Sequence, residues 1–280
     1  MRLPCALAIG GLDPGGGAGL AADLRGFGAT GAFGCAVIAV VTVQSTSGLR
    51  SVQSIDAKEV KAQAREVMRH QRVRAIKTGA LGSDANVRAV GELLAAHADV
   101  PAVVDPVIAP TRGKARLLAE RALDAMRRLL VPRAALITAN VGEAEALTGM
   151  RVSSVSEAHD AALALCRMGA RAALVKGGHM TGAQAIDVLA LQAVGTDGKR
   201  EKADVEVVEL RARRLRLPPI HGGGCTFAAL VAGHMAVDER SFGDAKLRVL
   251  VDAVRWAKRI HHRMLGSARD VGGEMRVLVP

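Results

Sequence analysis

The sequence predicts an α/β fold with a mostly parallel central sheet and helices on both of its faces. Short apolar or β-branched runs alternate about six times with longer amphipathic stretches, a pattern typical of strand–helix units joined into a parallel sheet. The short runs are mostly apolar, as expected for strands buried on both sides. No low-complexity linker, internal repeat or change of composition interrupts the chain, so we expect residues 1–280 to form a single domain.

Each predicted strand is a short apolar run bounded by residues that favour turns. In chain order the predicted strands are residues 6–10, 35–43, 75–78, 102–107, 135–138 and 172–176. The predicted helices are the longer stretches between them, in which apolar residues recur at helical spacing. They are residues 19–28, 57–70, 85–97, 117–130, 141–148 and 156–168.

The later part of the chain departs from this alternation. Residues 185–193 and 204–210 are expected to form a hairpin around the turn-rich stretch 195–198. Two further helices, residues 226–236 and 244–265, are expected after three consecutive glycines. The histidine pair His261-His262 on the last helix is expected to lie on a solvated face.

The composition argues against several classes of protein. Only 2% of the residues are aromatic and none is tyrosine, so the core must consist mainly of Ala, Val, Leu and Ile. The longest apolar run, residues 35–43, is far shorter than the roughly 20 residues that a membrane helix needs. The four cysteines are scattered and include no C-x-x-C pair, which argues against a disulfide framework and a zinc site. With no signal-peptide core before Gly10, we expect a cytoplasmic protein.

The net charge of +11 raises the question of nucleic-acid binding. Lys and Arg are spread along the whole chain, with one short cluster at residues 211–216, and the aromatic side chains that would stack on bases are missing. A solvated basic surface that also attracts nucleotides explains the charge better. We therefore expect a small-molecule substrate and no nucleic-acid or membrane partner.

The stretch Gly222-Gly223-Gly224-Cys225, which precedes an apolar helical segment, is the most informative feature of the chain. Three glycines let the backbone turn tightly and present several N–H groups to one anion, and the dipole of the following helix adds positive potential. The same dipole should favour the thiolate form of Cys225. An anion cradle beside an activatable side chain is what phosphoryl transfer to a hydroxyl requires.

A second glycine-rich loop, residues 10–19, follows the first predicted strand. Its tail, residues 17–22, fits the pattern G-x-G-x-x-A of a dinucleotide site, but the second strand ends in Thr-Val-Gln-Ser instead of the acidic residue that such a site needs. The loop also lacks the G-K-[ST] of a Walker P-loop. A dehydrogenase is therefore a weak alternative.

Other polar residues stand where predicted strands end, which is where doubly wound sheets bind their ligands. Gln44 could pair with a heteroaromatic ring that carries an amino group beside a ring nitrogen, or could simply cap its strand. Asp105 places a carboxylate at the end of its strand, facing the crevice in which such sheets bind ligands. Asn140 and Glu143 could hold Mg²⁺ through water, could cap a helix, or could do both. Lys176, beside two glycines, is placed to meet a phosphate.

Four motifs in this order and spacing resemble the hydroxymethylpyrimidine/phosphomethylpyrimidine kinases, the thiamine-biosynthesis branch of the ribokinase superfamily. They are G-x-D-P-x-G-G-A-G at residues 11–19, V-V-D-P-V at 103–107, K-G-G-H at 176–179 and H-G-x-G-C-T at 221–226. The resemblance covers almost the full chain. It implies a ribokinase-like three-layer sandwich, usually a homodimer, that uses MgATP to phosphorylate hydroxymethylpyrimidine and then its monophosphate.

The resemblance also implies roles for individual residues. Cys225 corresponds to the catalytic base, Gly222 to Gly224 match the anion hole, and Lys176 lies near the transferring phosphates. Asp105 and Glu143 match the acids on the magnesium side. The residues expected to contact the substrate are Gly11, Ala18, Asp23, Gln44 and Val107, and those expected to contact ATP are Asn140, Lys176, Thr226 and Lys258.

The chain departs from the family pattern at several positions. The family has Thr where Gly223 stands, Ser where Gly15 stands, Gln where Ala21 stands, and Pro where Ala139 and Gly142 stand. Two alternatives therefore remain beside the first interpretation. One is a pyridoxal-type kinase on the same scaffold, and the other is a paralogue that binds the pyrimidine as a sensor with little catalysis.

Overall fold

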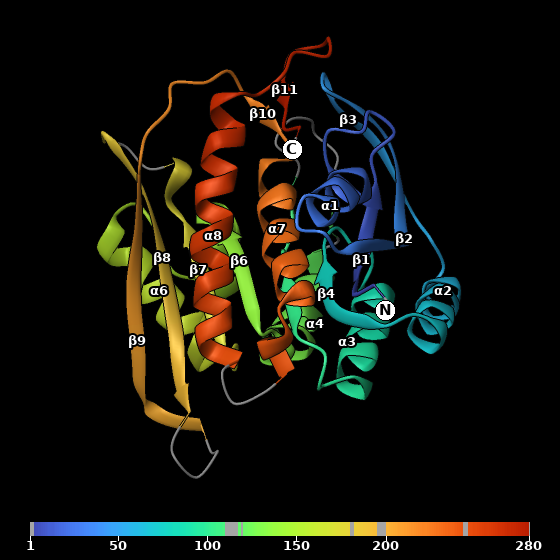
Figure 1. Cartoon of the computed structure of the whole chain (residues 1–280), viewed down its shortest axis with the longest axis horizontal. Helices are drawn as coiled ribbons and strands as arrows, with labels where there is room; N and C mark the ends of the chain where they lie inside the picture. The colour runs from blue at the N-terminus through green and yellow to red at the C-terminus, as the bar shows by residue number, and fades with distance from the viewer. Residues whose placement is uncertain are drawn as a thin grey trace.

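The computed structural model describes residues 3–109, 117–118, 120–179, 182–194, 200–242 and 246–279. Nine strands within these ranges form one sheet in the order β3-β2-β1-β4-β5-β6-β7-β8-β9 (Figure 1). They are β1 (Cys5–Leu12), β2 (Phe33–Ser45), β3 (Gly48–Ser54), β4 (Val73–Thr78), β5 (Ala102–Val104), β6 (Leu136–Asn140), β7 (Ala172–Lys176), β8 (Gln184–Val194) and β9 (Arg200–Arg213). Two short strands, β10 (Ile220–His221) and β11 (Arg276–Val277), pair separately.

The centre of the sheet is parallel and its edges are antiparallel. Strands β2, β1, β4, β5, β6 and β7 pair in parallel, as the alternation of strand and helix predicts. The predicted hairpin is confirmed, because β8 and β9 pair antiparallel and β8 also pairs antiparallel with β7. Its predicted turn, residues 195–198, lies outside the described residues. At the other edge β3 pairs antiparallel with β2.

Helices cover both faces of the sheet, as Figure 1 shows. One face packs against α2 (Ala57–His70), α3 (Asp84–Ala96), α4 (Glu120–Leu129), α5 (Val141–Thr148) and α6 (Val155–Arg167). The other packs against α1 (Gly19–Gly28), α7 (Gly223–Val237) and α8 (Lys246–Gly266). The short helices η1 (Val131–Arg133), η2 (Gly177–His179) and η3 (Glu239–Phe242) lie in connections. No helix of the described residues is long and apolar enough to cross a membrane.

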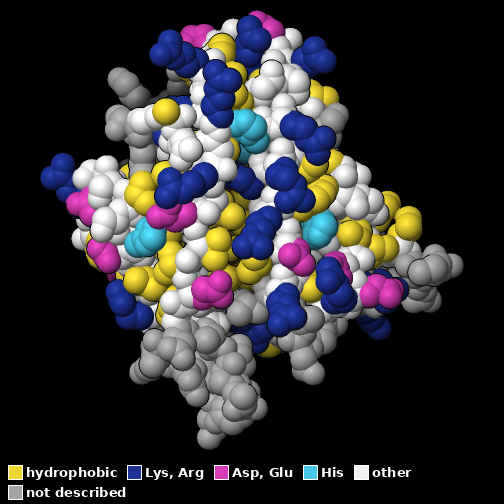
Figure 2. Space-filling model, turned by 60° about the vertical axis from the view of Figure 1, so that its left-hand side comes forward, with side chains coloured by type: hydrophobic (Ala, Val, Ile, Leu, Met, Phe, Trp, Pro, Cys, Tyr) yellow, Lys and Arg dark blue, Asp and Glu magenta, His cyan; other side chains and the backbone are white. Residues whose placement is uncertain are grey.

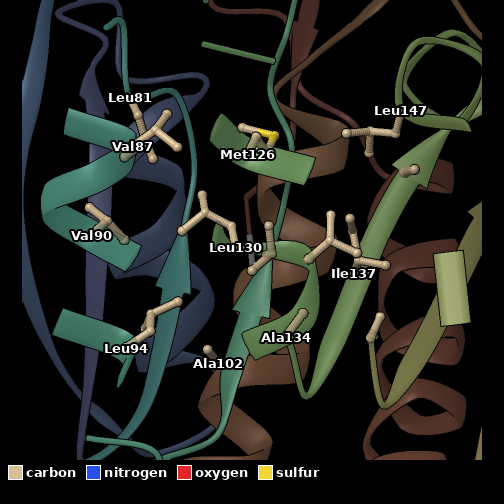
Figure 3. Close-up of a cluster of buried hydrophobic side chains, with 14 of the residues drawn as sticks. Leu81, Val87, Val90, Leu94, Ala102, Met126, Leu130, Ala134, Ile137 and Leu147 are labelled. Carbon is tan, nitrogen blue, oxygen red and sulfur yellow. The ribbon is translucent and has the colours of Figure 1, made fainter. Parts of the chain in front are cut away.

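The two faces have separate apolar cores because side chains alternate along each strand. In β1, Leu7 and Ile9 point into the core under α2 to α6, whereas Ala6 and Ala8 point into the core under α1, α7 and α8. Figure 3 shows part of the first core, where Met126 and Leu130 lie between the side chains of α3 and Ile137 of β6. These cores consist almost entirely of aliphatic side chains, as the scarcity of aromatic residues predicts.

Polar residues set several helix starts. The Asp56 carboxylate accepts the Lys58 N–H at the start of α2, and Ser83 accepts the Asn86 N–H at the start of α3. At α6, Ser154 caps the helix with Glu157 reaching back. Helices α2, α3 and α6 each begin at the predicted residue or one residue before it.

Several bounds differ from the prediction, among them those of β2 (Phe33–Ser45), α4 (Glu120–Leu129) and β9 (Arg200–Arg213), and one strand is not predicted. Strand β5 ends at Val104, before Asp105, because Pro106 lacks the N–H that a longer ladder would need. Strand β3 is not predicted at all, since Leu49 is its one buried residue and its sequence is largely polar. Helix α7 begins at Gly223, three residues earlier than expected, which matters for the site described next.

Candidate active site

A cavity of about 550 Å³ lies at the carboxyl ends of the central strands, beside the start of α7. Polar residues from three neighbouring strand ends line it, namely Asp105, Asn140 and Lys176. The glycine turn before α7 and Lys258 of α8 close the opposite side. This is the position at which a doubly wound sheet binds its ligand. Figure 2 shows Lys and Arg side chains spread over the adjoining face, with acidic side chains among them.

The glycine turn forms the first turn of α7. Gly222 is the N-cap in the left-handed region (φ 77°), and a side chain there would also overlap the carbonyl oxygen of Gly17. The first N–H groups of a helix have no partner within the helix, so Gly223, Gly224 and Cys225 present theirs at the positive end of the α7 dipole. A side chain on Gly224 would lie 3.3 Å from the Lys176 ammonium. A cation and helix N–H groups therefore lie where together they could bind one anion.

A row of alternating charges runs beneath this position. Lys77 of β4 is fully buried, and its ammonium lies 2.9 Å and 3.0 Å from the two carboxylate oxygens of Asp23. It also lies 3.9 Å from Asp105, which in turn lies 3.4 Å from Lys176. Burial alone would lower the pKa of Lys77, but the charges of Asp23, Cys225 and Asp105 outweigh it and raise that pKa. Lys77 therefore stays charged inside the protein.

Burial has the largest effect on the pKa of the Cys225 thiol. Burial raises its pKa to about 12, and the carboxylates of Asp105 and Asp23 add to the shift. The charge of Lys77 and a hydrogen bond from the Gly19 N–H act in the opposite direction. The expectation that the helix start makes the thiol ionise more easily is therefore wrong for the free protein, because removal of water disfavours the thiolate more than these donors favour it.

Asn140 and Glu143 form a capping box at the start of α5. The Glu143 N–H donates to Asn140 Oδ1 at 2.9 Å, and the Asn140 N–H donates to Glu143 Oε2 at 2.8 Å. The capping role is thus confirmed, and both residues also line the cavity. Burial raises the pKa of Glu143 to about 7; the Lys176 charge opposes this shift and the Asp105 charge adds to it. One Glu143 oxygen remains outside the cap.

On the other side of the cavity, Asp13 organises the first glycine-rich loop. Its carboxylate accepts the N–H groups of Gly15 (2.9 Å) and Ala18 (2.8 Å) and lies 2.8 Å from His221 Nε2. Burial alone would raise the pKa of Asp13, but the hydrogen bonds from His221 and the loop outweigh it and lower that pKa. His221 immediately precedes Gly222, so this contact joins the first loop to the anion-binding turn.

A sequence profile of the phosphomethylpyrimidine kinases matches residues 13–277. This chain belongs to the phosphomethylpyrimidine kinase family. It is 42% identical over 270 residues to a hydroxymethylpyrimidine/phosphomethylpyrimidine kinase of Streptomyces coelicolor, and the match covers 96% of this chain and 91% of that protein. The kinase is therefore a phosphotransferase, as the four motifs predict.

Solved structures agree on the fold. A Bacillus subtilis pyridoxal kinase, solved as an ADP complex, superimposes with a TM-score of 0.81 at 26% identity, covering 99% of this chain and 97% of that one. A phosphomethylpyrimidine kinase from Clostridium difficile gives a TM-score of 0.73 at 27% identity, covering 94% and 99%. The predicted ribokinase-like α/β fold, with its mostly parallel sheet, is confirmed.

The structure brings most of the predicted site residues of the kinase to one cavity. Those that line it are Ala18, Gln44, Asp105, Val107, Asn140, Glu143, Lys176, Gly222, Gly223, Gly224, Cys225 and Lys258. Three predicted residues do not line it. Asp23 is buried as the partner of Lys77, the Gly11 carbonyl faces Gly19, and Thr226 is buried with its N–H donated to Gly222. Contact of these three residues with a ligand stays a prediction, since they lie behind the residues that line the cavity.

Several residues of the site escape the sequence analysis. Lys77 could have been found from the sequence, because a lysine within a predicted buried strand requires an oppositely charged partner. Lys258 bonds to Asp187 at 2.6 Å, and the Gly177 N–H donates to the same carboxylate. His261, expected on a solvated face, instead lies 2.9 Å from the Gly223 carbonyl, and burial lowers its pKa to about 4. No local pattern predicts these contacts.

Proposed function

We propose that this kinase transfers the terminal phosphoryl group of ATP to the hydroxymethyl group of hydroxymethylpyrimidine, and then phosphorylates the monophosphate, as a step of thiamine biosynthesis. The observation that carries the proposal is the convergence of Lys176, the N-terminus of α7 and the Cys225 side chain on one cavity. A cation and helix N–H groups stabilise the charge of a transferring phosphoryl group. The names of the similar kinases supply the substrate, and Gln44 in the cavity supports a ring with an amino group.

Asp105 and Glu143 fit a magnesium ion. Both carboxylates line the cavity, and the charge of Asp105 helps to raise the pKa of Glu143, a repulsion that a cation would relieve. Among the described residues no group of three or more acidic, His or Cys side chains could hold a metal ion. Two carboxylates are enough for Mg²⁺, which usually keeps several waters and binds nucleotide phosphates. When bound, the ion would neutralise phosphate charge.

The other residues act on the substrates directly. We assign Cys225 as the acceptor of the hydroxyl proton, with Lys77 and the Gly19 N–H favouring its thiolate form. The N–H groups of Gly223 and Gly224 and the Lys176 ammonium hold the phosphoryl oxygens. Because the thiol of the free protein is protonated near neutral pH, the bound nucleotide complex has to favour the thiolate further.

The decisive test is a phosphoryl-transfer assay with MgATP and three acceptors: hydroxymethylpyrimidine, its monophosphate and pyridoxal. Pyridoxal is included because the Bacillus subtilis structure with a TM-score of 0.81 is a pyridoxal kinase. We expect turnover with both pyrimidines and less with pyridoxal. Preference for pyridoxal would contradict the proposed substrate, and ligand binding without any turnover would favour the sensor interpretation.

The role of Cys225 is tested with Cys225→Ala. We expect kcat to fall by about 10²–10⁴-fold, the usual effect of losing a general base, while the Kd for ATP stays close to that of the wild type. Cys166→Ala serves as a matched control. That thiol is buried in α6, which packs on the opposite face of the sheet from α7. Unchanged turnover in Cys225→Ala would remove the cysteine from the mechanism.

A further inference from the structure

The side-chain amide of Gln44, at the end of β2, lies between two polar residues. Gln44 Oε1 is 3.2 Å from Thr42 Oγ1, and Gln44 Nε2 is 3.5 Å from His221 Nε2. Thr42 and His221 are both buried, whereas Gln44 reaches the cavity. The hydrogens that Thr42 and His221 carry therefore decide which end of the amide each can bind.

Thr42 can only accept a hydrogen bond from Gln44. Its hydroxyl has one hydrogen, and Oγ1 lies 2.9 Å from the carbonyl oxygen of Leu12. Two oxygens at that distance need a hydrogen between them, and a carbonyl has none to give. The hydroxyl hydrogen is thus committed to Leu12, which leaves a lone pair of Thr42 facing Gln44. An amide N–H binds there, whereas an amide oxygen is repelled.

His221 imposes the opposite requirement. Its Nε2 lies 2.8 Å from Asp13 Oδ2, and Asp13 is a carboxylate held by the N–H groups of Gly15 and Ala18. A carboxylate only accepts hydrogen bonds, so His221 Nε2 carries a hydrogen. A ring nitrogen that carries a hydrogen has no lone pair, so it cannot accept an N–H from Gln44. The partial positive charge of the His221 N–H, which is donated to Asp13, instead favours the amide oxygen of Gln44 on that side.

Both requirements are met by one change, because half a turn of the amide exchanges its nitrogen and oxygen. We propose that Thr42 and His221 hold Gln44 with its N–H toward Thr42 and its carbonyl toward His221, and thereby select the ring that binds. Gln44 then offers one free N–H and one free lone pair to the cavity. The matching ligand is a heteroaromatic ring with an amino group beside a ring nitrogen, the amino group on the His221 side. The inference rests on the proposed pyrimidine substrate and adds the residues that set its recognition.

Thr42 is tested with two substitutions that differ by the hydroxyl. Thr42→Val keeps the shape and strand preference but cannot accept a hydrogen bond, whereas Thr42→Ser keeps the hydroxyl. The readouts are KM and kcat for hydroxymethylpyrimidine, for the analogue with hydrogen in place of the amino group, and for ATP. Calorimetric binding of both pyrimidines in a Cys225→Ala background gives Kd without turnover.

We expect Thr42→Val to weaken hydroxymethylpyrimidine binding by about ten-fold, the effect of one lost hydrogen bond, and to reduce the preference for the amino compound over its analogue. The KM for ATP should not change, and Thr42→Ser should bind like the wild type. If Thr42→Val keeps the wild-type preference between the two pyrimidines, the inference is wrong. If the wild type binds both pyrimidines but phosphorylates neither, the proposed function is wrong. The ratio of the two Kd values in Thr42→Val and in the wild type then still tests the inference.

The hydrogen on His221 can be tested in the unmodified protein. Nitrogen-15 NMR of the imidazole distinguishes its two neutral tautomers. The proposal requires a hydrogen on Nε2, bonded to Asp13, in the ligand-free kinase. An unprotonated Nε2 would overturn it regardless of how any variant folds.

Discussion

Cys225 lies among charged groups that act on its thiol in opposite directions. Burial and the carboxylates of Asp105 and Asp23 favour the thiol, whereas Lys77 and the Gly19 N–H favour the thiolate. Asp23, whose pKa burial raises to about 6 against the opposing charge of Lys77, is the buried partner of that lysine beneath the site. At the scale of single residues, the protonation state of Cys225 depends on the balance between its burial and these neighbouring charges.

The raised pKa of Cys225 predicts slow alkylation of the free kinase. With iodoacetamide, the rate at Cys225 should be low near neutral pH and keep rising to the highest pH at which the protein is folded, because only the thiolate reacts. The Cys225→Ala variant supplies the background from the three buried cysteines. A rate that levels off near neutral pH would show that the thiol ionises much more easily than the structure indicates.

The raised pKa of Glu143 predicts a pH-dependent cost in stability. Glu143 is protonated more readily in the folded protein than in the unfolded chain. Its contribution to the free energy of unfolding is therefore fully present below the ordinary pKa of 4.5 and is lost as pH rises through about 7. Glu143→Gln removes that loss and keeps a residue type that serves in a capping box. At about pH 8 we expect the variant to have a free energy of unfolding a few kcal/mol above that of the wild type, seen as a higher unfolding temperature. Near pH 4 the two proteins should differ little.

The same substitution should reduce activity, because it removes one of the two carboxylates proposed to hold Mg²⁺. A loss of about 10–100-fold in kcat/KM is expected, together with a weaker dependence on magnesium concentration. Thermal unfolding at the two pH values separates the stability effect from the catalytic one. Equal stabilisation at both pH values would contradict the assignment of the pKa shift to Glu143.

At the scale of elements, the start of α7 depends on one glycine more than on its neighbours. Gly222 has a left-handed backbone and contacts Gly17, whereas a side chain on Gly223 would meet Ile220 at 3.5 Å and His261 at 3.8 Å, ordinary packing distances. This turn therefore has room for a Cβ at position 223, where the family pattern has Thr. The close packing at Gly222 brings the first loop against the helix that carries Cys225.

This difference predicts opposite outcomes for two similar substitutions. Gly222→Ala should destabilise the kinase by about 1–3 kcal/mol or more, from backbone strain and overlap with the Gly17 carbonyl, and should greatly reduce turnover. Gly223→Ala should leave the unfolding temperature close to that of the wild type. Urea denaturation of both variants checks the prediction, which fails if Gly222→Ala is as stable as Gly223→Ala.

At the scale of the whole molecule, the C-terminal segment connects distant parts of the site. The N–H groups of Glu274 and Met275 donate to the Thr46 carbonyl after β2, and β11 pairs with β10 before the anion-binding turn. Met275 also lines the cavity. The C-terminal segment is therefore joined, beside the cavity, to the residue that follows β2 and to the strand that precedes the glycine turn.

A truncation tests this connection. Removing residues 269–280 takes away the partner of β10 and the Met275 wall, so we expect a lower unfolding temperature and a KM for hydroxymethylpyrimidine raised by about ten-fold or more. A control that removes only residues 279–280 keeps the buried Leu278 and should resemble the wild type. If both truncations have wild-type KM values, the segment does not shape the substrate side of the cavity.

Sequence order and local pattern determined the α/β class, most strands and helices, and the chemical type of the site. Apolar runs, helical periodicity and glycine turns depend on neighbouring residues, so they can be read from the chain directly. The polar strand ends could also be grouped, because parallel strands bring their carboxyl ends to one edge of the sheet. That reasoning placed Asp105, Asn140 and Lys176 in one cavity, where the structure has them.

Only the tertiary structure decided how the charged and polar groups are paired. Asp13 and His221 are 208 residues apart, and Lys77 meets Asp23 across 54 residues, so no local spacing predicts either contact. The same pairing moved Asp23 from the expected ligand pocket to the protein interior and set the burial that raises the pKa of Cys225. A pKa or a hydrogen-bond direction depends on the sum of surrounding charges and on the water removed by packing, and both exist only once the chain is folded.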